Sequence, residues 1–361
     1  MPKTTVLFIC GEKESYPRNN QILKSLNDEF EVIKITSDKP SYPLRIIEVL
    51  TRLAIASLFK NYQLVLAGFL GQPLVPAIRF IARKPLILDA FVSVYDALCL
   101  DRKDFKPDSF MGKTAYRLDA LSFRLADKII TDTRANADFF SKLFKIKREK
   151  FYALYMGTDE SVFYPRADKT NNDKFIVFFH GTFWGLHGID YIIKAAKLLE
   201  NRTDILFKLL GGGRKKKEII ELAERLKLKN VEFLDWISYQ DLSCQIAESD
   251  ICLGGHFSGS EKAKRVISGK SIQYLAMKKP VIAGDSLAAK ELFTHAENIY
   301  LCAMADEKSL AEAVIALKEN ASLRNNIAQA GFKLFKGRLN SQETKNRLQE
   351  IIAGLPGLQM I

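Results

Sequence analysis

Short apolar, β-branched runs alternate along the chain with longer stretches in which hydrophobic residues recur every three or four positions. A continuous apolar run of four to eight residues is typical of a buried strand, and the wider spacing is typical of an amphipathic helix. In the first half the pattern predicts strands at 6–10, 31–36, 63–69, 85–91, 128–133 and 151–157. Helices are predicted between them, at 18–28, 43–60, 74–83, 110–126 and 134–145.

A polar stretch at 165–174 interrupts the alternation, which then begins again. The second series predicts strands at 175–182, 205–212, 231–236, 251–255, 280–285 and 298–304, and the tail predicts helices at 307–319, 322–335 and 341–353. Apolar strands separated by helices indicate parallel sheets covered on both faces. We therefore expect an α/β protein of two doubly wound, Rossmann-like domains facing each other across a cleft. The expected domains are 1–165 and 166–337, with a helix in 338–361 returning to the first.

Composition excludes disordered and fibrous classes, because 47% of the residues are hydrophobic and 27% are charged. The excess of 54 Lys and Arg over 42 Asp and Glu, a net charge of +12, favours anionic partners or serves solubility alone. Five scattered cysteines form no metal-ligand pattern, so we expect neither a disulfide framework nor a metal site, and a reducing, cytoplasmic location. No nucleic-acid motif is present, and we expect no nucleic-acid partner.

The basic excess has a specific location in the second half. Lys262, Lys264, Arg265 and Lys270 surround the start of a predicted helix at 270–277, and glycines precede helices at 181–188 and 211–213. Ligands of open parallel sheets bind beyond the carboxyl ends of the strands, where helix N-termini and backbone N–H groups attract anions. This arrangement predicts a diphosphate site. For Lys215, Lys216 and Lys217 a solvated charged face is the favoured interpretation.

Several segments together resemble the GT-B glycosyltransferases, in particular the retaining enzymes of family 4. They are ADKIITDTRANADFF (126–140), MGTDESVFYP (156–165), FFHGTFWGLHGIDYIIKAAKLL (178–199), FKLLGGG (207–213), VEFLDWISYQDLSCQIAESDICLG (231–254) and GKSIQYLAMKKPVIAGD (269–285). The resemblance implies a nucleotide-diphosphate sugar held by the second domain and a surface-glycan or lipid-linked acceptor held by the first. It implies retaining transfer without a metal, and no cofactor besides the nucleotide sugar.

The chain departs from the family's pattern at four positions. Thr182 and His187 stand where members carry an arginine and a lysine that contact the diphosphate, and Arg265 and Gln273 stand where members carry two glutamates. A glutamine amide can still bond a ribose hydroxyl, and Arg265 with Lys270 could restore the phosphate-binding charge. The expected donor-binding residues are Gly181, Thr182, His187, Gly212, Lys270, Gln273 and Glu291. The expected catalytic residues are Asp96, Lys270 and Arg265.

The first domain offers acceptor-side candidates. Arg18 begins a helix after the first strand, and Asp89 and Asp96 follow the fourth strand, where family members often carry a sugar-binding His-Asp pair. The helix at 43–62 carries an apolar stripe with Arg45, Arg52 and Lys60 at intervals. Contact with the inner face of an anionic membrane is one interpretation of this helix, and plain coverage of a sheet is the other.

Three functions therefore stay open, the third being an epimerase or phosphorylase of the same two-domain fold. The first is a retaining, metal-independent glycosyltransferase of EC class 2.4. The second is a non-catalytic relative of the same fold that binds nucleotide sugar or glycan, which the four departures would explain.

Overall fold

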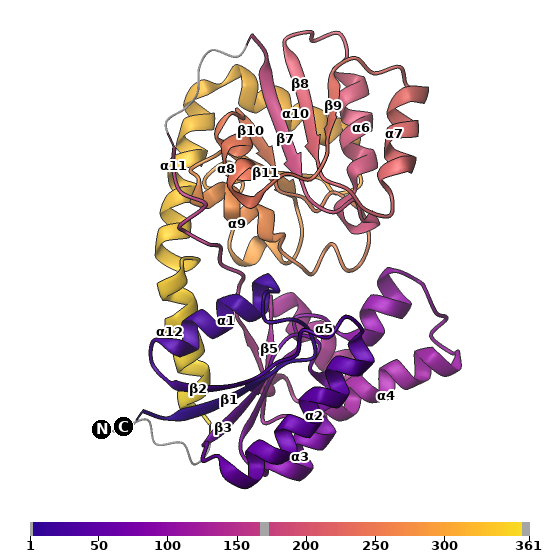
Figure 1. The fold of residues 1–361 in the computed structure, drawn as a ribbon. Helices are drawn as coiled ribbons and strands as arrows, with labels where there is room; N and C mark the ends of the chain where they lie inside the picture. Colours follow the sequence, from indigo (N-terminus) through magenta and orange to yellow (C-terminus); the bar gives the residue numbers. More distant parts are fainter. Residues whose placement is uncertain (1–2, 167–172, 356–361) are drawn as a thin grey trace. The chain divides into compact units, whose positions relative to one another are not determined.

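The computed structural model describes residues 3–166 and 173–355 and divides into two compact units. Unit 1 comprises Met1–Met156 and Ser341–Ile361, and unit 2 comprises Gly157–Asn340 (Figure 1). The first boundary falls nine residues before the expected position because Phe163 is buried against Tyr239 of unit 2. Most of the polar stretch at 165–174, and the end of 338–361, lie outside the described residues.

Unit 1 is built on a six-stranded parallel sheet in the order β2-β1-β3-β4-β5-β6. Its strands are β1 (Thr5–Ile9), β2 (Glu31–Ile35), β3 (Leu64–Ala67), β4 (Leu86–Asp89), β5 (Lys128–Thr131) and β6 (Phe151–Ala153). Its α-helices are α1 (Pro17–Asn27), α2 (Tyr42–Phe59), α3 (Val75–Ala82), α4 (Phe110–Leu125), α5 (Arg134–Phe144) and α12 (Ser341–Ala353). Short turns of helix are η1 (Gln72–Leu74), η2 (Asp96–Asp101) and η3 (Arg148–Lys150).

Both faces of this sheet are covered by helices. Residues of α2 to α5 pack on one face, where Val49, Leu53 and Phe123 are fully buried. On the other face α1 and α12 lie together, and Ile352 of α12 is fully buried against strand residues. The last helix therefore belongs to unit 1 although 184 residues of unit 2 precede it (Figure 1).

Unit 2 has a parallel sheet in the order β12-β11-β10-β7-β8-β9. Its strands are β7 (Phe175–His180), β8 (Ile205–Leu210), β9 (Val231–Leu234), β10 (Ile251–Leu253), β11 (Val281–Gly284) and β12 (Tyr300–Cys302). Its α-helices are α6 (Ile189–Leu198), α7 (Lys216–Arg225), α8 (Tyr239–Ala247), α9 (Gly269–Ala276), α10 (Glu307–Glu319) and α11 (Ala321–Arg338), with short helices η4 (Gly185–His187) and η5 (Ala289–Glu291). All twelve predicted strands form, within a few residues at each end.

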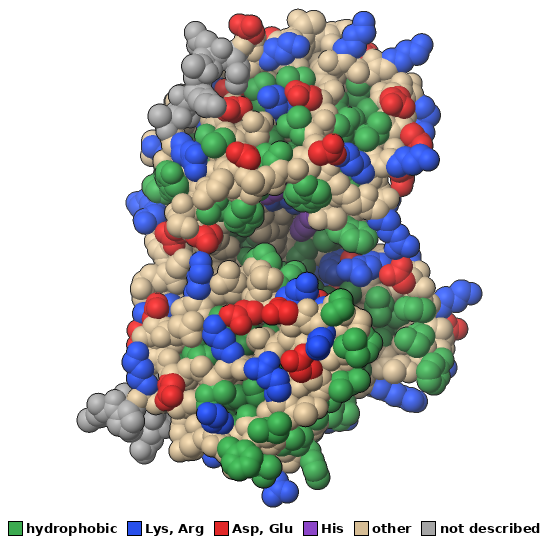
Figure 2. Space-filling view, viewed as in Figure 1, with side chains coloured by type: hydrophobic (Ala, Val, Ile, Leu, Met, Phe, Trp, Pro, Cys, Tyr) green, Lys and Arg blue, Asp and Glu red, His purple; other side chains and the backbone are tan. Residues whose placement is uncertain are grey.

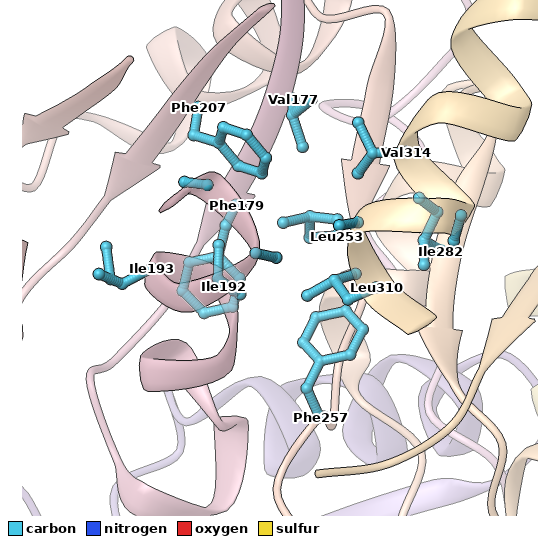
Figure 3. Close-up of a cluster of buried hydrophobic side chains, with 14 of the residues drawn as sticks. Val177, Phe179, Ile192, Ile193, Phe207, Leu253, Phe257, Ile282, Leu310 and Val314 are labelled. Atoms are coloured by element: carbon cyan, nitrogen blue, oxygen red, sulfur yellow. The ribbon is translucent and has the colours of Figure 1, made fainter. Parts of the chain in front are cut away.

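The main core of unit 2 lies between its sheet and helices α6 and α10. Phe207 and Val177 of the sheet meet Ile192 of α6 and Val314 of α10, and all four are fully buried (Figure 3). Burying large apolar side chains contributes about 1.5–3 kcal/mol each. This core holds the carboxyl ends of β7 and β10 in place.

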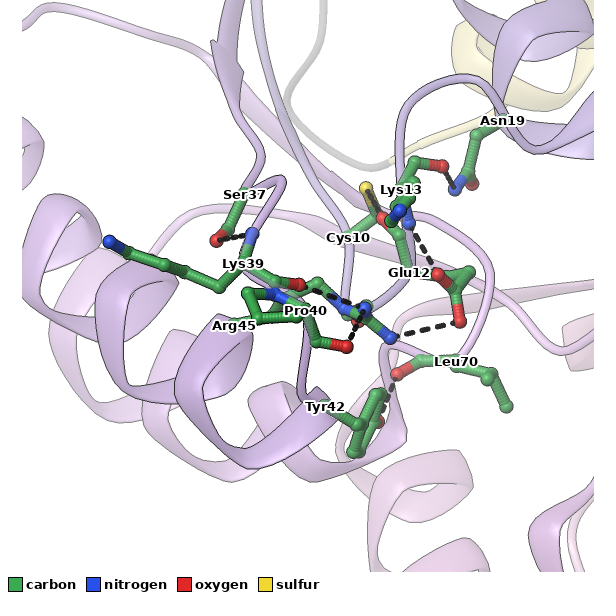
Figure 4. Close-up of polar contacts among 11 residues, drawn as sticks. Cys10, Glu12, Lys13, Asn19, Ser37, Lys39, Pro40, Tyr42, Arg45 and Leu70 are labelled. Carbon is green, nitrogen blue, oxygen red and sulfur yellow. Dashed lines mark hydrogen bonds and ion pairs between the residues drawn. The ribbon is translucent and has the colours of Figure 1, made fainter.

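Polar contacts in unit 1 connect the loop after β1 with the start of α2. The Arg45 guanidinium pairs with Glu12 at 3.2 Å and donates to the backbone carbonyl oxygens of Gly11 and Lys39 (Figure 4). Arg45 is only 7% exposed, so of the three cations of this helix it is the one that the fold buries. Among the described residues, no helix combines the length and hydropathy needed to span a membrane.

Candidate functional site

The strand order of unit 2 reverses between β7 and β10, which are neighbours in the sheet. The chain runs from β7 to β8 and β9 on one side, and from β10 to β11 and β12 on the other. The loops that leave β7 and β10 therefore diverge, and a crevice opens at such a switch point. Helix α9, which follows β10, begins at this carboxyl edge, and its N-terminus carries partial positive charge.

Glycines shape the backbone at this edge. Gly181 and Gly211 adopt φ of +143° and +135°, and a Cβ on Gly211 would lie 2.1 Å from the carbonyl oxygen of Gly181. A Cβ on Gly181 would lie 3.0 Å from Cε of Lys270. The two loops therefore approach each other too closely for side chains. Gly181 thus lies next to Lys270 at the basic helix start, and its expected role in donor binding stays a prediction.

Gly211→Ala is expected to lower the free energy of unfolding by about 2–3 kcal/mol, because the methyl group meets a backbone carbonyl and alanine rarely adopts this φ. Urea unfolding measures the change. Gly337→Ala is the control, because it lies in α11 with open space around its Cβ and should stabilise by about 0.5–1 kcal/mol. Equal stability of Gly211→Ala and wild type would contradict the close approach.

Lys270 lies in the first turn of α9 and is only 7% exposed. Its Nζ donates to Oγ of Ser268 at 3.0 Å, lies 3.2 Å from Nδ1 of His187, and stands over the ring of Phe179. No carboxylate of the described residues offsets the effect of burial, which lowers the pKa of Lys270 to about 7. A buried ammonium without an anion is costly, so this position favours an anionic ligand.

Two histidines extend this basic cluster. Nδ1 of His187 and Nδ1 of His256 lie 3.0 Å apart, and their rings stack. Burial, and then the neighbouring Lys270 charge, lower the pKa of both imidazoles well below the usual range. Both are therefore neutral near pH 7, and His187 can accept a hydrogen bond from Lys270. We call Lys270, His187 and His256 the basic cluster.

The N-terminus of α9 is open beside the basic cluster. Ser268 precedes the helix but makes no side-chain cap, because its Oγ accepts from Lys270 instead. A Cβ on Gly269 would meet nothing within 4 Å. Backbone N–H groups in the first turn of a helix lack partners within the helix. An oxyanion at this position would meet the helix dipole, those N–H groups and the Lys270 ammonium together.

Gln273 lies one turn further along α9 and connects two aromatic residues. Its Oε1 accepts from Nε2 of His180 at 2.9 Å, and its Nε2 donates to the Tyr239 hydroxyl at 3.0 Å. The Tyr274 hydroxyl lies 2.8 Å from Nδ1 of His180. Burial lowers the pKa of His180 to about 3, so the neutral ring donates from Nε2 and accepts at Nδ1, which satisfies the whole chain of contacts.

The remaining donor-binding candidates and the catalytic candidate Arg265 follow strands at the same edge of the sheet. A Cβ on Gly212 would lie 3.1 Å from Nε1 of Trp236. Thr182 follows Gly181, and its carbonyl oxygen accepts from the Trp184 N–H. Arg265 is 6% exposed, and its Nε donates to the carbonyl oxygen of Glu261. Glu291 is the last residue of η5. The backbone N–H of Ala288, the residue before η5, donates to the Lys264 carbonyl oxygen. The roles assigned to these residues stay predictions.

In unit 1, Arg18 and Asp89 form a buried ion pair. Both side chains are 0% exposed, and Nη2 of Arg18 lies 3.0 Å from Oδ1 of Asp89. Nε of Arg18 also donates to Asp89, and Nη1 donates to the Leu154 carbonyl oxygen at 2.9 Å. The pair connects α1, β4 and the end of β6 inside the unit. An acceptor-side role for either residue stays a prediction.

Asp96 begins η2 and is 1% exposed. Its backbone N–H donates to Oγ of Ser93, which in turn donates to Oδ2 of Asp119 at 2.6 Å. Burial raises the pKa of Asp119 to about 6 despite these donors. The structure thus places Asp96 in a buried polar network at the carboxyl edge of the unit 1 sheet.

The comparisons with known proteins agree with this architecture. HepE of Anabaena, in a crystal structure with UDP and glucose, aligns over 98% of this chain and 100% of its own, at 17% identity and a TM-score of 0.73. Sucrose-phosphate synthase of Thermosynechococcus elongatus aligns over 97% and 98%, at 14% identity and a TM-score of 0.79. The chain has the GT-B fold. At such identities the likeness concerns the GT-B fold alone.

Sequence adds evidence for the second unit. Residues 163–334 match the family model described as glycosyl transferases group 1. A glycosyltransferase of Rickettsia africae with 15% identity aligns over 98% of both chains at a TM-score of 0.66. None of the curated proteins matches the chain significantly. The group 1 segment and the GT-B fold together support a GT-B glycosyltransferase. The match covers the basic cluster, Gln273 and its partners.

Sequence reasoning did not find Ser268, Tyr239 and Tyr274 as members of this site. Ser268 is two residues before Lys270, so its proximity could have been expected from its position before the helix. The Tyr239 contact with Gln273 joins residues 34 apart and carries no local signal. Among the described residues, no group of three or more His, Cys, Asp or Glu side chains is placed to hold a metal ion.

Proposed function

We propose that this protein transfers a sugar from a nucleotide-diphosphate donor to a cell-surface polysaccharide or lipid-linked glycan. Transfer proceeds with retention and without a metal. The observation that carries the proposal is the basic cluster at the N-terminus of α9, where a buried ammonium has no carboxylate partner among the described residues. The GT-B fold and the group 1 match of residues 163–334 support the same reaction class.

Lys270 of α9 supplies a cation that members of the family carry at the position of His187. The resemblance expects a lysine at position 187, where this chain has histidine. Nζ of Lys270 reaches to 3.2 Å from Nδ1 of His187, so an ammonium lies beside that position although it comes from α9. This replacement favours an active enzyme over a non-catalytic relative, because it restores the charge that a diphosphate requires.

The chemistry follows from where charge develops. The bond between the sugar's anomeric carbon and the diphosphate oxygen breaks, and the acceptor oxygen bonds to that carbon on the same face. The departing phosphate oxygen takes the acceptor's proton. Negative charge grows on that phosphate in an oxocarbenium-like transition state, and Lys270 and the α9 N–H groups stabilise it.

Gln273 is proposed to hold the ribose. It is partly exposed, and its contacts use one lone pair of Oε1 and one N–H of Nε2. A second lone pair and a second N–H remain for a ribose hydroxyl. His180 and Tyr239 fix the orientation of the amide, so the two vacant positions point in a defined direction.

The test is turnover of nucleotide sugars. The purified protein is expected to bind one of a panel of UDP-, GDP- and ADP-sugars and to release nucleotide slowly without acceptor, and faster with membrane-glycan extracts. A CMP-sugar is the control, because its single phosphate cannot occupy a diphosphate site fully. Nucleotide release is measured by chromatography.

Four outcomes have distinct meanings. Turnover of a diphosphate donor supports the enzyme, and inversion at the anomeric carbon of the product would contradict retention. Tight binding without turnover, even with acceptor extracts, would favour the non-catalytic relative. Absence of diphosphate binding would overturn the assignment of the basic cluster.

A further inference from the structure

Helix α2 exposes an apolar stripe on the side that faces away from the sheet. Leu44, Ile47, Ile55, Leu58 and Phe59 are 50–78% exposed and recur at helical spacing. The inward side of the same helix is also apolar, with Val49 and Leu53 fully buried. A surface helix normally has charged residues on its outward face, so the exposed stripe requires a separate explanation.

The stripe continues onto the neighbouring helices α3 and α4, which cover the same side of the sheet as α2. Phe80 of α3 is 77% exposed, and Phe110 of α4 is 83% exposed. Among the described residues seventeen large hydrophobic side chains are exposed, and eleven of them lie between Leu44 and Leu121. The apolar face is defined here as Leu44, Ile47, Ile55, Leu58, Phe59, Phe80, Phe110, Met111 and Leu121. Hydrophobic and basic side chains intermingle over these helices in Figure 2.

The exposed charges around the apolar face are almost all positive. Between residues 42 and 127 the fully exposed anionic residues are Asp104 and Asp108. Two partly exposed carboxylates, Glu48 and Asp127, pair with Arg52 and Arg79. The exposed cationic side chains in the same range are Arg52, Lys60, Arg79, Arg83, Lys84, Arg102, Lys103, Lys106, Lys113, Arg117 and Arg124. Eleven cations against two anions make this face complementary to a negatively charged surface.

A hollow of about 400 Å³ lies where α3 ends, and Phe80 of the same helix is exposed. It is lined by Arg79, Arg83, Lys84, Pro85 and Asp127. Asp127 pairs with Arg79 at 3.0 Å, whereas Arg83 and Lys84 take part in no ion pair of the described residues. The hollow therefore presents two uncompensated cations at the end of a helix that also carries an exposed aromatic ring. This arrangement suits a phosphate group at the surface of a lipid bilayer.

We infer that the apolar face of α2, α3 and α4 docks on an anionic lipid bilayer. The exposed Leu and Phe side chains enter the interface, the surrounding Lys and Arg meet lipid phosphates, and the hollow at Arg83 and Lys84 receives a headgroup. A second copy of the chain is disfavoured as the occupant, because two such faces would bring their cations together. This inference goes beyond the proposed function and stands whatever the acceptor is.

Vesicle flotation tests the inference with the full chain. The protein is expected to bind phosphatidylcholine vesicles containing 30% phosphatidylglycerol, and to bind pure phosphatidylcholine at least tenfold more weakly. Leu58→Asp/Phe59→Asp, and separately Arg83→Glu/Lys84→Glu, should each lower the partition coefficient about tenfold or more. The matched controls are Leu198→Asp/Leu287→Asp and Lys217→Glu/Lys229→Glu, which change exposed residues of unit 2 and should bind as wild type.

Urea unfolding followed by far-UV circular dichroism verifies that each variant is folded in both units. Nucleoside diphosphate binding by unit 2 separates a failure of this inference from a failure of the proposed function. Equal vesicle binding by wild type and both unit 1 variants would overturn the inference. Equal binding to neutral and anionic vesicles would overturn it too. Sedimentation showing a dimer that Leu58→Asp/Phe59→Asp dissociates would assign the face to self-association, and would also overturn it.

Discussion

Replacing Lys270 by methionine is expected to weaken the binding of a nucleoside diphosphate by about 10- to 100-fold, the range for loss of a charged hydrogen bond. Methionine keeps the length of the side chain against Gly181 and Phe179 but removes the ammonium. The folded state should tolerate the change, because a buried charge without a carboxylate partner is replaced by an apolar group. Isothermal titration calorimetry with UDP, GDP and ADP measures the affinities.

Lys333→Met is the matched control, since Lys333 is an exposed residue of α11 in the same unit. Its affinity for the diphosphate should equal that of wild type. Unchanged affinity in Lys270→Met would remove the basic cluster from the donor site, and the proposed function would lose its main support.

The same lysine sets a pH dependence. Burial lowers the pKa of Lys270 from 10.5 to about 7, so between these values the native protein holds fewer protons here than the unfolded chain. The free energy of unfolding should therefore rise with pH across this window, by at most about 1.4 kcal/mol per pH unit. A bound diphosphate favours the charged amine and raises this pKa again. Diphosphate affinity should consequently decrease as pH rises above about 7.

Calorimetry at pH 8 in two buffers of different ionisation enthalpy measures the linked proton. Wild type is expected to take up close to one proton for each diphosphate bound, whereas Lys270→Met should take up clearly fewer. An identical uptake in both proteins would show that another group titrates.

Replacing Arg18 by methionine is expected to lower the free energy of unfolding by about 3–5 kcal/mol, because Asp89 would remain as a buried, unpaired carboxylate. Both tryptophans, Trp184 and Trp236, lie in unit 2, so their fluorescence does not report on unit 1. Urea unfolding followed by far-UV circular dichroism, with hydrogen exchange of unit 1 amides, measures the loss.

The double variant Arg18→Met/Asp89→Leu should recover most of this stability, since it leaves no unpaired charge. Arg148→Met is the control for an exposed ion pair with Asp138 and should cost about 1 kcal/mol or less. If Arg18→Met were as stable as wild type and lost acceptor binding, the pair would be functional rather than structural. If it lost stability alone, the acceptor-side prediction for Arg18 would be wrong.

The order of elements could be predicted from the sequence because it depends on local patterns. Each strand is a short apolar run, and each helix repeats its apolar residues every three or four positions, so type and order follow without tertiary information. The unit to which the last helix belongs could not be predicted from local patterns alone. Ile351 and Ile352 are apolar and would fit the core of either unit. Their helix packs against α1, which is far away in the sequence, and this contact places it in unit 1.

Some features of the candidate site could likewise be predicted from the sequence, and others depend on the tertiary structure. The sequence by itself determined the parallel α/β architecture, the glycine loops and a basic helix start after β10, because these are properties of neighbouring residues. Only the tertiary structure decided how distant polar groups pair. In the folded protein Lys270 contacts His187, and Gln273 donates a hydrogen bond to Tyr239. Arg18 pairs with Asp89 inside unit 1. Such pairing depends on burial and on contacts between residues 34 to 83 positions apart, which no local pattern encodes.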